Sequence, residues 1–491
     1  MPHDFASTER LAVPASGDGL FTRGAFAALV WDGVFSQALG SLTGGALLVG
    51  CALALGASPA YVGVLSAIPF FAQLAYVPAI ILVERVRQRK SICVAVTFLA
   101  RLMLVPLAVV PLLSDRGLAL MVLLLCFALV GPLGAIGGCA WMSWTCDLVP
   151  RERLGAVFSR RQLAANLSGI LAALAGAAVV EGWAAARPHL PLGGYVGVFS
   201  LAIVAAMGST WFLTRMPDVP MPPKPPGDLR ALFARPFRNA NFRRVMIFLG
   251  CWSFASNMAM PFFTVYLMQD LGCGIAVPAA LAIAGQLANL ASLPAWGKLS
   301  DRFSNKRVIA MAAPLLLVAV LGWVLAAEPA PHMLTLPLIV MAQLMLGAAS
   351  GGLDLACGNI ALKTAPKGEA TVYLGTNGLF KSLCGGVGPV AGGWLARSFA
   401  GASCSLTVPW QGHAITLFTL KPLAVVFLVA CLAGLLALTR LPGIAEPGET
   451  ILGLPVLCDL RLRAKAARAA GASLANAGWA GRGRARKTRI T

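Results

Sequence analysis

The chain has 491 residues, of which 58% are hydrophobic and only 12% are charged, and its formal net charge is +20. This composition lies outside the range of soluble globular proteins and excludes a soluble fold. The apolar runs are continuous rather than alternating, which excludes a β-barrel and predicts an all-α polytopic membrane protein.

The chain opens with a polar segment, residues 1–24, that lacks the cleavage pattern of a signal peptide. Apolar runs long enough to cross a hydrocarbon core of about 30 Å then recur along the chain. We predict twelve helices, at residues 25–50, 60–83, 91–113, 117–143, 162–182, 193–214, 244–268, 275–296, 308–327, 333–357, 370–396 and 418–440.

A proline-rich connection divides these helices into two groups of six. It spans residues 215–243 and contains "MPDVPMPPKPPGD", which is incompatible with a regular helix. We therefore expect one bundle over residues 25–214 and a second over 244–440. The remaining segment, 441–491, is basic, and we predict a disordered cytoplasmic tail that is attracted to anionic lipids.

The placement of the basic residues predicts the topology. Nearly all of the 39 Lys and Arg lie in the termini and in the loops after the even-numbered helices. Because Lys and Arg accumulate on the cytoplasmic side of membranes, we expect both termini in the cytoplasm and the protein in the inner membrane. This distribution accounts for the positive charge without nucleic acid, which we do not expect as a partner.

Two charged loops resemble each other across the halves. The first reads "LVERVRQRKS", from Leu82 to Ser91, and the second reads "WGKLSDRFSNKR", from Trp296 to Arg307. In each loop, three residues separate an acidic-basic pair from a pair of basic residues. Glu84-Arg85 and Arg89-Lys90 match Asp301-Arg302 and Lys306-Arg307, all at an offset of 217, and Pro150-Arg151 matches Pro366-Lys367 at an offset of 216. This repeat indicates an internal duplication, which in membranes commonly builds two half-bundles around a central site.

With twelve spans, a central loop and this repeat, the chain resembles the major facilitator superfamily (MFS) of bacterial-type transporters. The family motif, G-x-x-x-D-R-x-G-R-K/R, is matched well in the second loop and weakly in the first. The resemblance implies two six-helix bundles, alternating access, and a cytoplasmic gate formed by Glu84, Arg85, Arg89, Gly297, Asp301, Arg302, Lys306 and Arg307.

Two gate residues carry specific structural expectations. Gly297 would let two helices approach closely, and Asp301 would meet the partial positive charge of a neighbouring helix start. For Arg302, Lys306 and Arg307, a plain topology signal remains an equal alternative.

A glycine-rich stretch, "CGGVGPVAGG" from Cys384 to Gly393, resembles an antiporter signature of the same superfamily. That signature belongs in the fifth helix, whereas this stretch lies in the eleventh, so it does not indicate antiport. We interpret its glycines as close-packing positions around a kink at Pro389.

Ionisable residues inside spans are costly in lipid and are the main functional candidates. Asp32 could carry a proton or hold a cation, or reach back to water from its helix end. Arg101 could contact an anion or snorkel to the interface, and Asp354 and Lys381 could bind substrate or form a structural ion pair. Polar residues add further candidates for substrate contact, of which we select Asn257, Gln286 and Asn377.

The sequence predicts a transporter rather than an enzyme. It has no Walker motif, no Cys/His cluster and no catalytic constellation, so we expect no ATP site, metal or cofactor. We predict a monomeric, proton-coupled secondary transporter for an unidentified small molecule, with export of an amphiphile slightly favoured. The alternative is a non-transporting member of the same fold that carries a pigment or assists assembly of a membrane complex.

Overall fold

The structure is a computed structural model that describes residues 22–150, 153–221, 229–326, 332–366, 369–401, 404–410 and 413–447. Within these ranges, eleven helical segments are long and apolar enough to cross a membrane. A further helix, α14 (Ala370–Ser398), is 29 residues long and carries Lys381 inside it. The predicted all-α polytopic fold is therefore confirmed.

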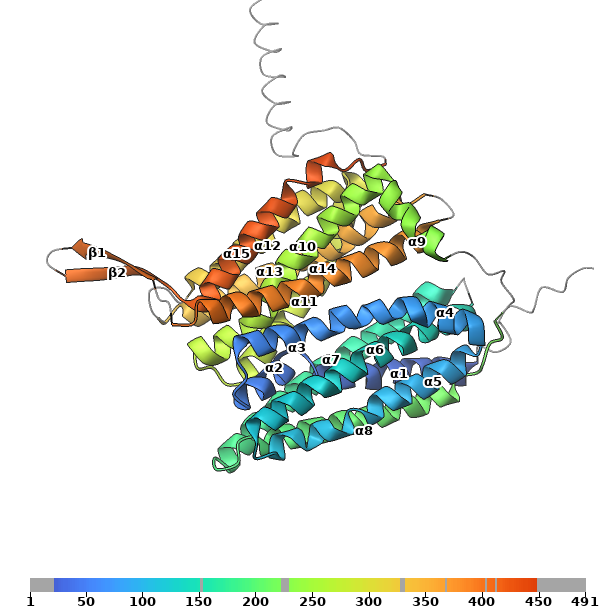
Figure 1. Cartoon of the computed structure of the whole chain (residues 1–491), viewed down its shortest axis with the longest axis horizontal. Coiled ribbons are helices and arrows are strands. Elements are labelled where there is room, and N and C mark those ends of the chain that lie inside the picture. The colour runs from blue at the N-terminus through green and yellow to red at the C-terminus, as the bar shows by residue number, and fades with distance from the viewer. Residues whose placement is uncertain are drawn as a thin grey trace, which may run out of the picture.

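The first half contains the helices that precede the proline-rich connection (Figure 1). Their bounds are α1 (Arg23–Leu42), α2 (Gly45–Ala54), α3 (Pro59–Ala72), α4 (Tyr76–Val86), α5 (Arg89–Leu102), α6 (Arg116–Leu148), α7 (Leu154–Ala186) and α8 (Gly193–Arg215). Short 3-10 turns follow α3 and α5, namely η2 (Gln73–Ala75), η3 (Val105–Ala108) and η4 (Val110–Leu112).

The second half lies beside the first and repeats its long helices (Figure 1). Its elements are α9 (Leu229–Arg238), α10 (Ala240–Val265), η6 (Tyr266–Asp270), α11 (Ala276–Arg302), α12 (Asn305–Leu325), α13 (Thr335–Thr364), α14, α15 (Pro422–Leu438) and η7 (Leu441–Gly443). An antiparallel hairpin of β1 (Cys404–Trp410) and β2 (His413–Leu420) projects from the bundle between α14 and α15.

Local chemistry explains where several helices begin and break. The side chains of Thr22, Ser58 and Asn239 accept backbone hydrogen bonds at the starts of α1, α3 and α10. The predicted single helix 25–50 is divided into α1 and α2 because Gly44 and Gly45 interrupt it, and Gly45 has a positive φ of 53°.

Other differences from the sequence-based expectation affect the site. Helix α7 begins at Leu154 rather than at residue 162, which places Arg161 inside the helix. The connection 215–243 contains α9, and the loop before α15 contains the hairpin, neither of which was predicted. The predicted disordered tail, 441–491, is wrong at its start, because residues 441–447 contain the turn η7 and the buried Glu446. Residues 448–491 lie outside the described residues.

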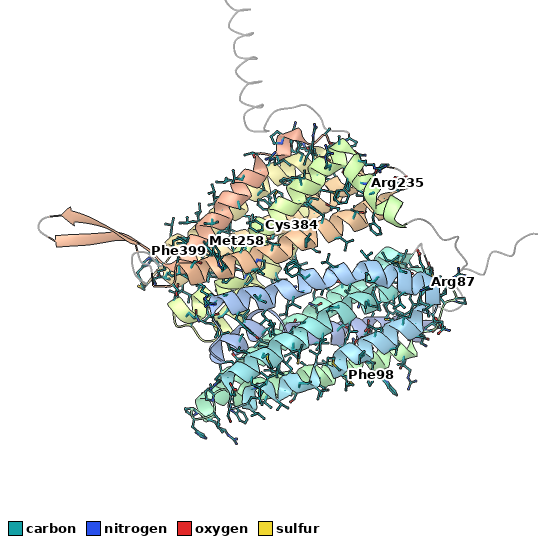
Figure 2. All side chains as sticks on the ribbon, in the orientation of Figure 1. Arg87, Phe98, Arg235, Met258, Cys384 and Phe399 are labelled. Carbon is teal, nitrogen blue, oxygen red and sulfur yellow. The ribbon has the colours of Figure 1, made fainter. Side chains whose placement is uncertain are left out.

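The two ends of the bundle differ in character. Figure 2 places Arg87 and Arg235 at one end, which we call the basic end, and Phe399 at the other, which we call the hairpin end. The positive-inside rule predicts that the basic end faces the cytoplasm.

Close contacts join the halves away from the basic end. A Cβ at Gly63 of α3 would clash with the carbonyl oxygen of Pro389 in α14, and a Cβ at Gly393 would lie 2.7 Å from the carbonyl oxygen of Pro59. On the other side of the interface, Glu181 of α7 accepts a hydrogen bond of 2.8 Å from the backbone N–H of Ala276. The ribbons of the halves are close here and separate toward the basic end (Figure 1).

The glycine-rich stretch of α14 packs as the sequence predicted. Gly385 and Gly386 face Phe70 and Phe71 of α3, since added Cβ atoms would approach those rings to about 3 Å. Other glycines of the stretch face backbone atoms of α10 or α3, namely Gly388, Gly392 and Gly393. The close-packing interpretation of this stretch is therefore confirmed.

Candidate substrate site

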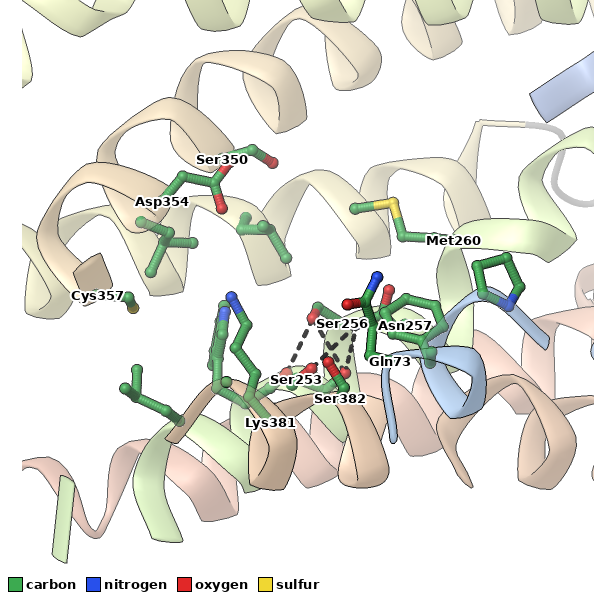
Figure 3. Close-up of a pocket in the computed structure, with 17 residues that line it drawn as sticks. Gln73, Ser253, Ser256, Asn257, Met260, Ser350, Asp354, Cys357, Lys381 and Ser382 are labelled. Carbon is green, nitrogen blue, oxygen red and sulfur yellow. Dashed lines mark hydrogen bonds between the residues drawn. The ribbon is translucent and has the colours of Figure 1, made fainter. Parts of the chain in front are cut away.

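A cavity of about 570 Å³ lies between the halves. The first half contributes the end of α3 and η2, and the second contributes α10, α12, α13 and α14 (Figure 3). Aromatic and apolar side chains alternate with hydroxyl and amide groups around it. The lining residues that the argument uses are Phe70, Gln73, Trp252, Ser253, Asn257, Met260, Asp354 and Lys381.

Two opposite charges face this central cavity. Asp354 comes from α13 and Lys381 from α14, and Figure 3 shows their charged groups on facing walls. Both residues are solvent-exposed within the cavity. Within the described chain no salt bridge joins them, so this conformation does not contain the structural ion pair that was one alternative for them.

Polar groups of α10 form a local hydrogen-bond network at the cavity wall. The Asn257 amide nitrogen donates to the carbonyl oxygen of Ser253 at 2.8 Å and lies 3.3 Å from its hydroxyl. Since its nitrogen is engaged with its own helix, the Asn257 carbonyl oxygen is the group that is available to a ligand.

Two of the predicted contact residues lie elsewhere. Gln286 is exposed on α11 and does not line the cavity, and Asn377 is buried in α14 with its side-chain oxygen lacking a partner among the described residues. The structure thus brings Asn257, Asp354 and Lys381 together but not Gln286 or Asn377.

Asp32 lies in a separate pocket of about 260 Å³ inside the first half. This residue is 2% exposed, and its carboxylate accepts a hydrogen bond of 2.6 Å from Ser209 and pairs with Arg161 at 3.3 Å. Asp32 therefore does not reach back to water in this conformation, and its negative charge is compensated within the half.

Arg101 belongs to the same network. Its guanidinium donates to Ser209 at 2.7 Å and to Thr210, so it is connected to Asp32 through the Ser209 hydroxyl. It is 6% exposed and does not snorkel in this conformation.

Arg161 is the functional candidate that the sequence analysis missed. Besides pairing with Asp32, it donates to the carbonyl oxygen of Leu29 at 3.2 Å and lies 4.5 Å from the ring centroid of Trp141. Because α7 was predicted to begin at residue 162, Arg161 was counted as a cytoplasmic loop charge. In the sequence, Arg161 differs from Arg160 only in its position along the helix. Only a helix that begins before residue 160 places Arg161 inside the bundle.

The first charged loop is anchored through Arg89. This side chain is 2% exposed, pairs with Asp147 at 2.5 Å and donates to the carbonyl oxygens of Ser143 and Val219. It ties the start of α5 to the end of α6 and to the chain after α8. Glu84 and Arg85 are exposed beside it.

The second charged loop differs from its expected geometry. A Cβ at Gly297 would meet nothing within 4 Å, so the predicted close approach of helices at Gly297 is absent. Asp301 is exposed and forms no ion pair with the described residues, while the guanidinium groups of Arg302 and Arg307 lie over the Phe303 ring at 5.3 and 5.7 Å. The gate role of these residues remains a prediction.

Glu446, rather than Asp301, meets the helix start at this loop. Its carboxylate accepts hydrogen bonds from the backbone N–H of Lys306 at 2.9 Å and from the Asn305 side chain at 2.7 Å, and it pairs with Lys363 at 3.1 Å. Lys306 in turn donates to the carbonyl oxygen of Ile444 at 2.9 Å. The segment after α15 thus joins the basic ends of α12 and α13.

We predict that Glu446→Gln lowers the free energy of unfolding by about 1–3 kcal/mol at neutral pH. Burial alone would raise the pKa of Glu446, but hydrogen bonds from Lys306, Asn305 and Lys363 outweigh it and lower that pKa below its ordinary value of 4.5. A lowered pKa stabilises the fold above pH 4.5, and this contribution is lost as pH falls through the folded-state value.

Thermal unfolding measured from neutral to acidic pH tests the role of Glu446. The difference between wild type and Glu446→Gln should shrink below about pH 4.5. Glu369→Gln, which removes the exposed pair with Arg235, serves as the matched control and should have a small effect. A difference that stays constant over the whole range contradicts the assignment.

No group of three or more His, Cys, Asp or Glu among the described residues is placed to hold a metal ion. The geometry instead defines a polytopic membrane protein with two helical halves around a central cavity. The family model of the major facilitator superfamily matches residues 33–389 and 253–450, and the chain belongs to this superfamily.

Comparisons with solved structures agree on the fold. The chain superposes on a mutant form of the nucleoside transporter NupG with a TM-score of 0.61 and 13% identity, covering 86% of this chain and 100% of that one. The inward open xylose transporter XylE from E. coli gives a TM-score of 0.59 and 14% identity, with coverage of 88% and 99%. At these identities the similarity shows the fold alone.

One curated relative is similar over a limited region. "Efflux pump dotC" of Dothistroma septosporum is 32% identical over 143 residues, which cover 28% of this chain and 23% of that protein. The chain therefore matches less than a quarter of the length of this relative.

Proposed function

We propose that the protein is a secondary active transporter that moves a small amphiphilic molecule by alternating access. The observation that carries this proposal is the central cavity, which is lined by both halves and contains two charges that do not pair with each other. Close packing of α3 against α14 and of α7 against α11 closes the hairpin end. A rocking motion of one half against the other would close the basic end and open the hairpin end.

We propose that protons drive this motion through Asp32. The carboxylate joins α1 to α7 through Arg161 and to α8 through Ser209. Protonation of Asp32 would remove its attraction for Arg161 and weaken both connections, so the packing of the first half would depend on the proton.

We propose that the protein is a monomer in the inner membrane and that it exports an amphiphile. Phe70, Trp252 and Met260 provide apolar and aromatic walls suited to an amphiphilic compound. The limited similarity to an efflux pump supports export, because that relative is named for this activity.

The test is transport by purified protein in liposomes under an imposed pH gradient, with pooled metabolites and cationic amphiphiles as substrates. Asp32→Asn should abolish gradient-driven accumulation while it preserves exchange down a substrate gradient. Asp115→Asn is the matched control, because Asp115 is an exposed helix cap at the start of α6 and Asn caps equally well.

Each outcome of this assay has a distinct meaning. Unaltered accumulation by Asp32→Asn would remove Asp32 from the coupling role. No movement of any compound by folded wild-type protein would overturn the transport proposal and favour the non-transporting carrier or assembly role.

A further inference from the structure

The central cavity holds one charge of each sign. Among the residues that line it, Asp354 and Lys381 are the only charged ones, and they lie on different helices of the second half. Their charged groups point into the cavity (Figure 3), and no salt bridge joins them. Neither charge therefore forms a salt bridge with a described residue in this conformation.

The charged residues of the first half lie outside the central cavity. Asp32 and Arg161 pair with each other, and Arg101 bonds to Ser209 and Thr210, all within the separate pocket of that half. The residues that the first half contributes to the central cavity are Pro69, Phe70 and Gln73, which carry no charge. Among the described residues that line the central cavity, a ligand thus meets only Asp354 and Lys381 as charged partners.

Closure of the basic end would favour a substrate that provides a partner for each of these two charges. When the cavity closes around its substrate, water leaves, and a charge without a partner becomes costly. A purely cationic substrate would compensate Asp354 but leave Lys381 exposed to a second positive charge. A purely anionic one would do the reverse, and a neutral one would compensate neither.

We infer that the substrate is a zwitterion with an apolar body, whose cationic group binds Asp354 and whose anionic group binds Lys381. This inference rests on the proposed transport function and names its substrate class. The apolar body lies against Phe70, Trp252 and Met260, and the Asn257 carbonyl oxygen accepts a hydrogen bond from the cationic end. The volume of about 570 Å³ accommodates an amino acid that carries a bulky apolar substituent.

A matched set of three probes tests this inference. Nε-dansyl-lysine is a zwitterion at its α-carbon, its methyl ester retains only the cation, and its Nα-acetyl derivative retains only the anion. Binding to purified full-length protein in detergent is measured by dansyl fluorescence. We expect the zwitterion to bind at least about tenfold more tightly than either derivative.

Two variants assign the two ends of the probe. Asp354→Asn should weaken binding of the zwitterion and the ester by about tenfold but leave the acetyl derivative unchanged, and Lys381→Gln should show the reverse selectivity. The double variant keeps neither charge and should bind the three probes alike. Thermal unfolding of each variant verifies that it is folded, and Ser382→Ala is the control for an uncharged change at the same wall.

Equal binding of the three probes to folded wild-type protein, including no binding of any, would overturn the inference. So would an identical response of all probes to Asp354→Asn and Lys381→Gln. Counterflow of the zwitterion in liposomes separates this result from the proposed function. Selective binding without counterflow would overturn transport alone, whereas transport of a pure cation that is insensitive to Lys381→Gln would overturn the zwitterion alone.

Discussion

Gly63→Ala is expected to reduce transport strongly by preventing closure of the hairpin end. The new Cβ would clash with the carbonyl oxygen of Pro389, which belongs to the backbone of α14 and has no side-chain rotamer to move away. Overpacking of this kind costs about 1–3 kcal/mol. The clash lies between the two halves, so it destabilises the conformation in which the hairpin end is closed. A cost of this size corresponds to about a 5- to 150-fold decrease in the population of that conformation.

The measurement is the rate of transport together with the accessibility to thiol reagents of a cysteine introduced at Ala60, next to this contact. Gly63→Ala should increase labelling from the hairpin end as transport falls. The matched control is Gly375→Ala, also in a long helix, where an added Cβ meets no atom within 4 Å. Equal behaviour of the two variants would contradict the role of the α3–α14 contact.

Arg161→Ala is expected to destabilise the protein by about 3–5 kcal/mol, because it leaves a buried carboxylate without its charged partner. Asp32 is 3% exposed at its side chain, whereas Arg161 is 16% exposed and also contacts Trp141 and the Leu29 carbonyl. Asp32→Asn should therefore cost less, because the remaining Arg161 retains those contacts.

A double-mutant cycle measures this pair directly. Thermal unfolding of Arg161→Ala, Asp32→Asn and the double variant should show that the double variant is more stable than Arg161→Ala alone. The neighbouring exposed Arg160→Ala is the control and should change stability by at most about 0.5 kcal/mol. Strictly additive effects of the two single changes would mean that the pair contributes nothing.

The intramembrane charges illustrate how much of the site could be predicted. A charge inside an apolar run is rare, which made four residues identifiable: Asp32, Arg101, Asp354 and Lys381. The structure places the first two in the pocket of the first half and the last two in the central cavity. Their assignment to separate pockets was not predictable. It depends on the rotation of each helix about its axis, and the sequence of one helix does not specify which neighbour a given face meets.

The charged loops show the opposite limit. The motif marked the loop after α11 correctly, but Asp301 and Gly297 do not make the contacts that the motif suggested, and Glu446 caps the next helix instead. Glu446 lies well over a hundred residues from Lys306 along the chain, in the segment that the sequence predicted to be a disordered tail. Only the packing of the chain end against α12 and α13 reveals its partners.

By itself, the sequence determined the class of the protein: a membrane-spanning bundle in two halves, with its basic loops on one side and a tightly packed glycine-rich helix. These features are local, since the length of an apolar run and the absence of side chains at successive glycines act within one segment. The tertiary structure alone decided that Arg161 neutralises Asp32, that Glu446 closes the second charged loop, and that Asp354 and Lys381 face one cavity. Those results depend on side chains from distant segments meeting at a few ångströms, and electrostatic interactions at that range are set by helix position and not by composition.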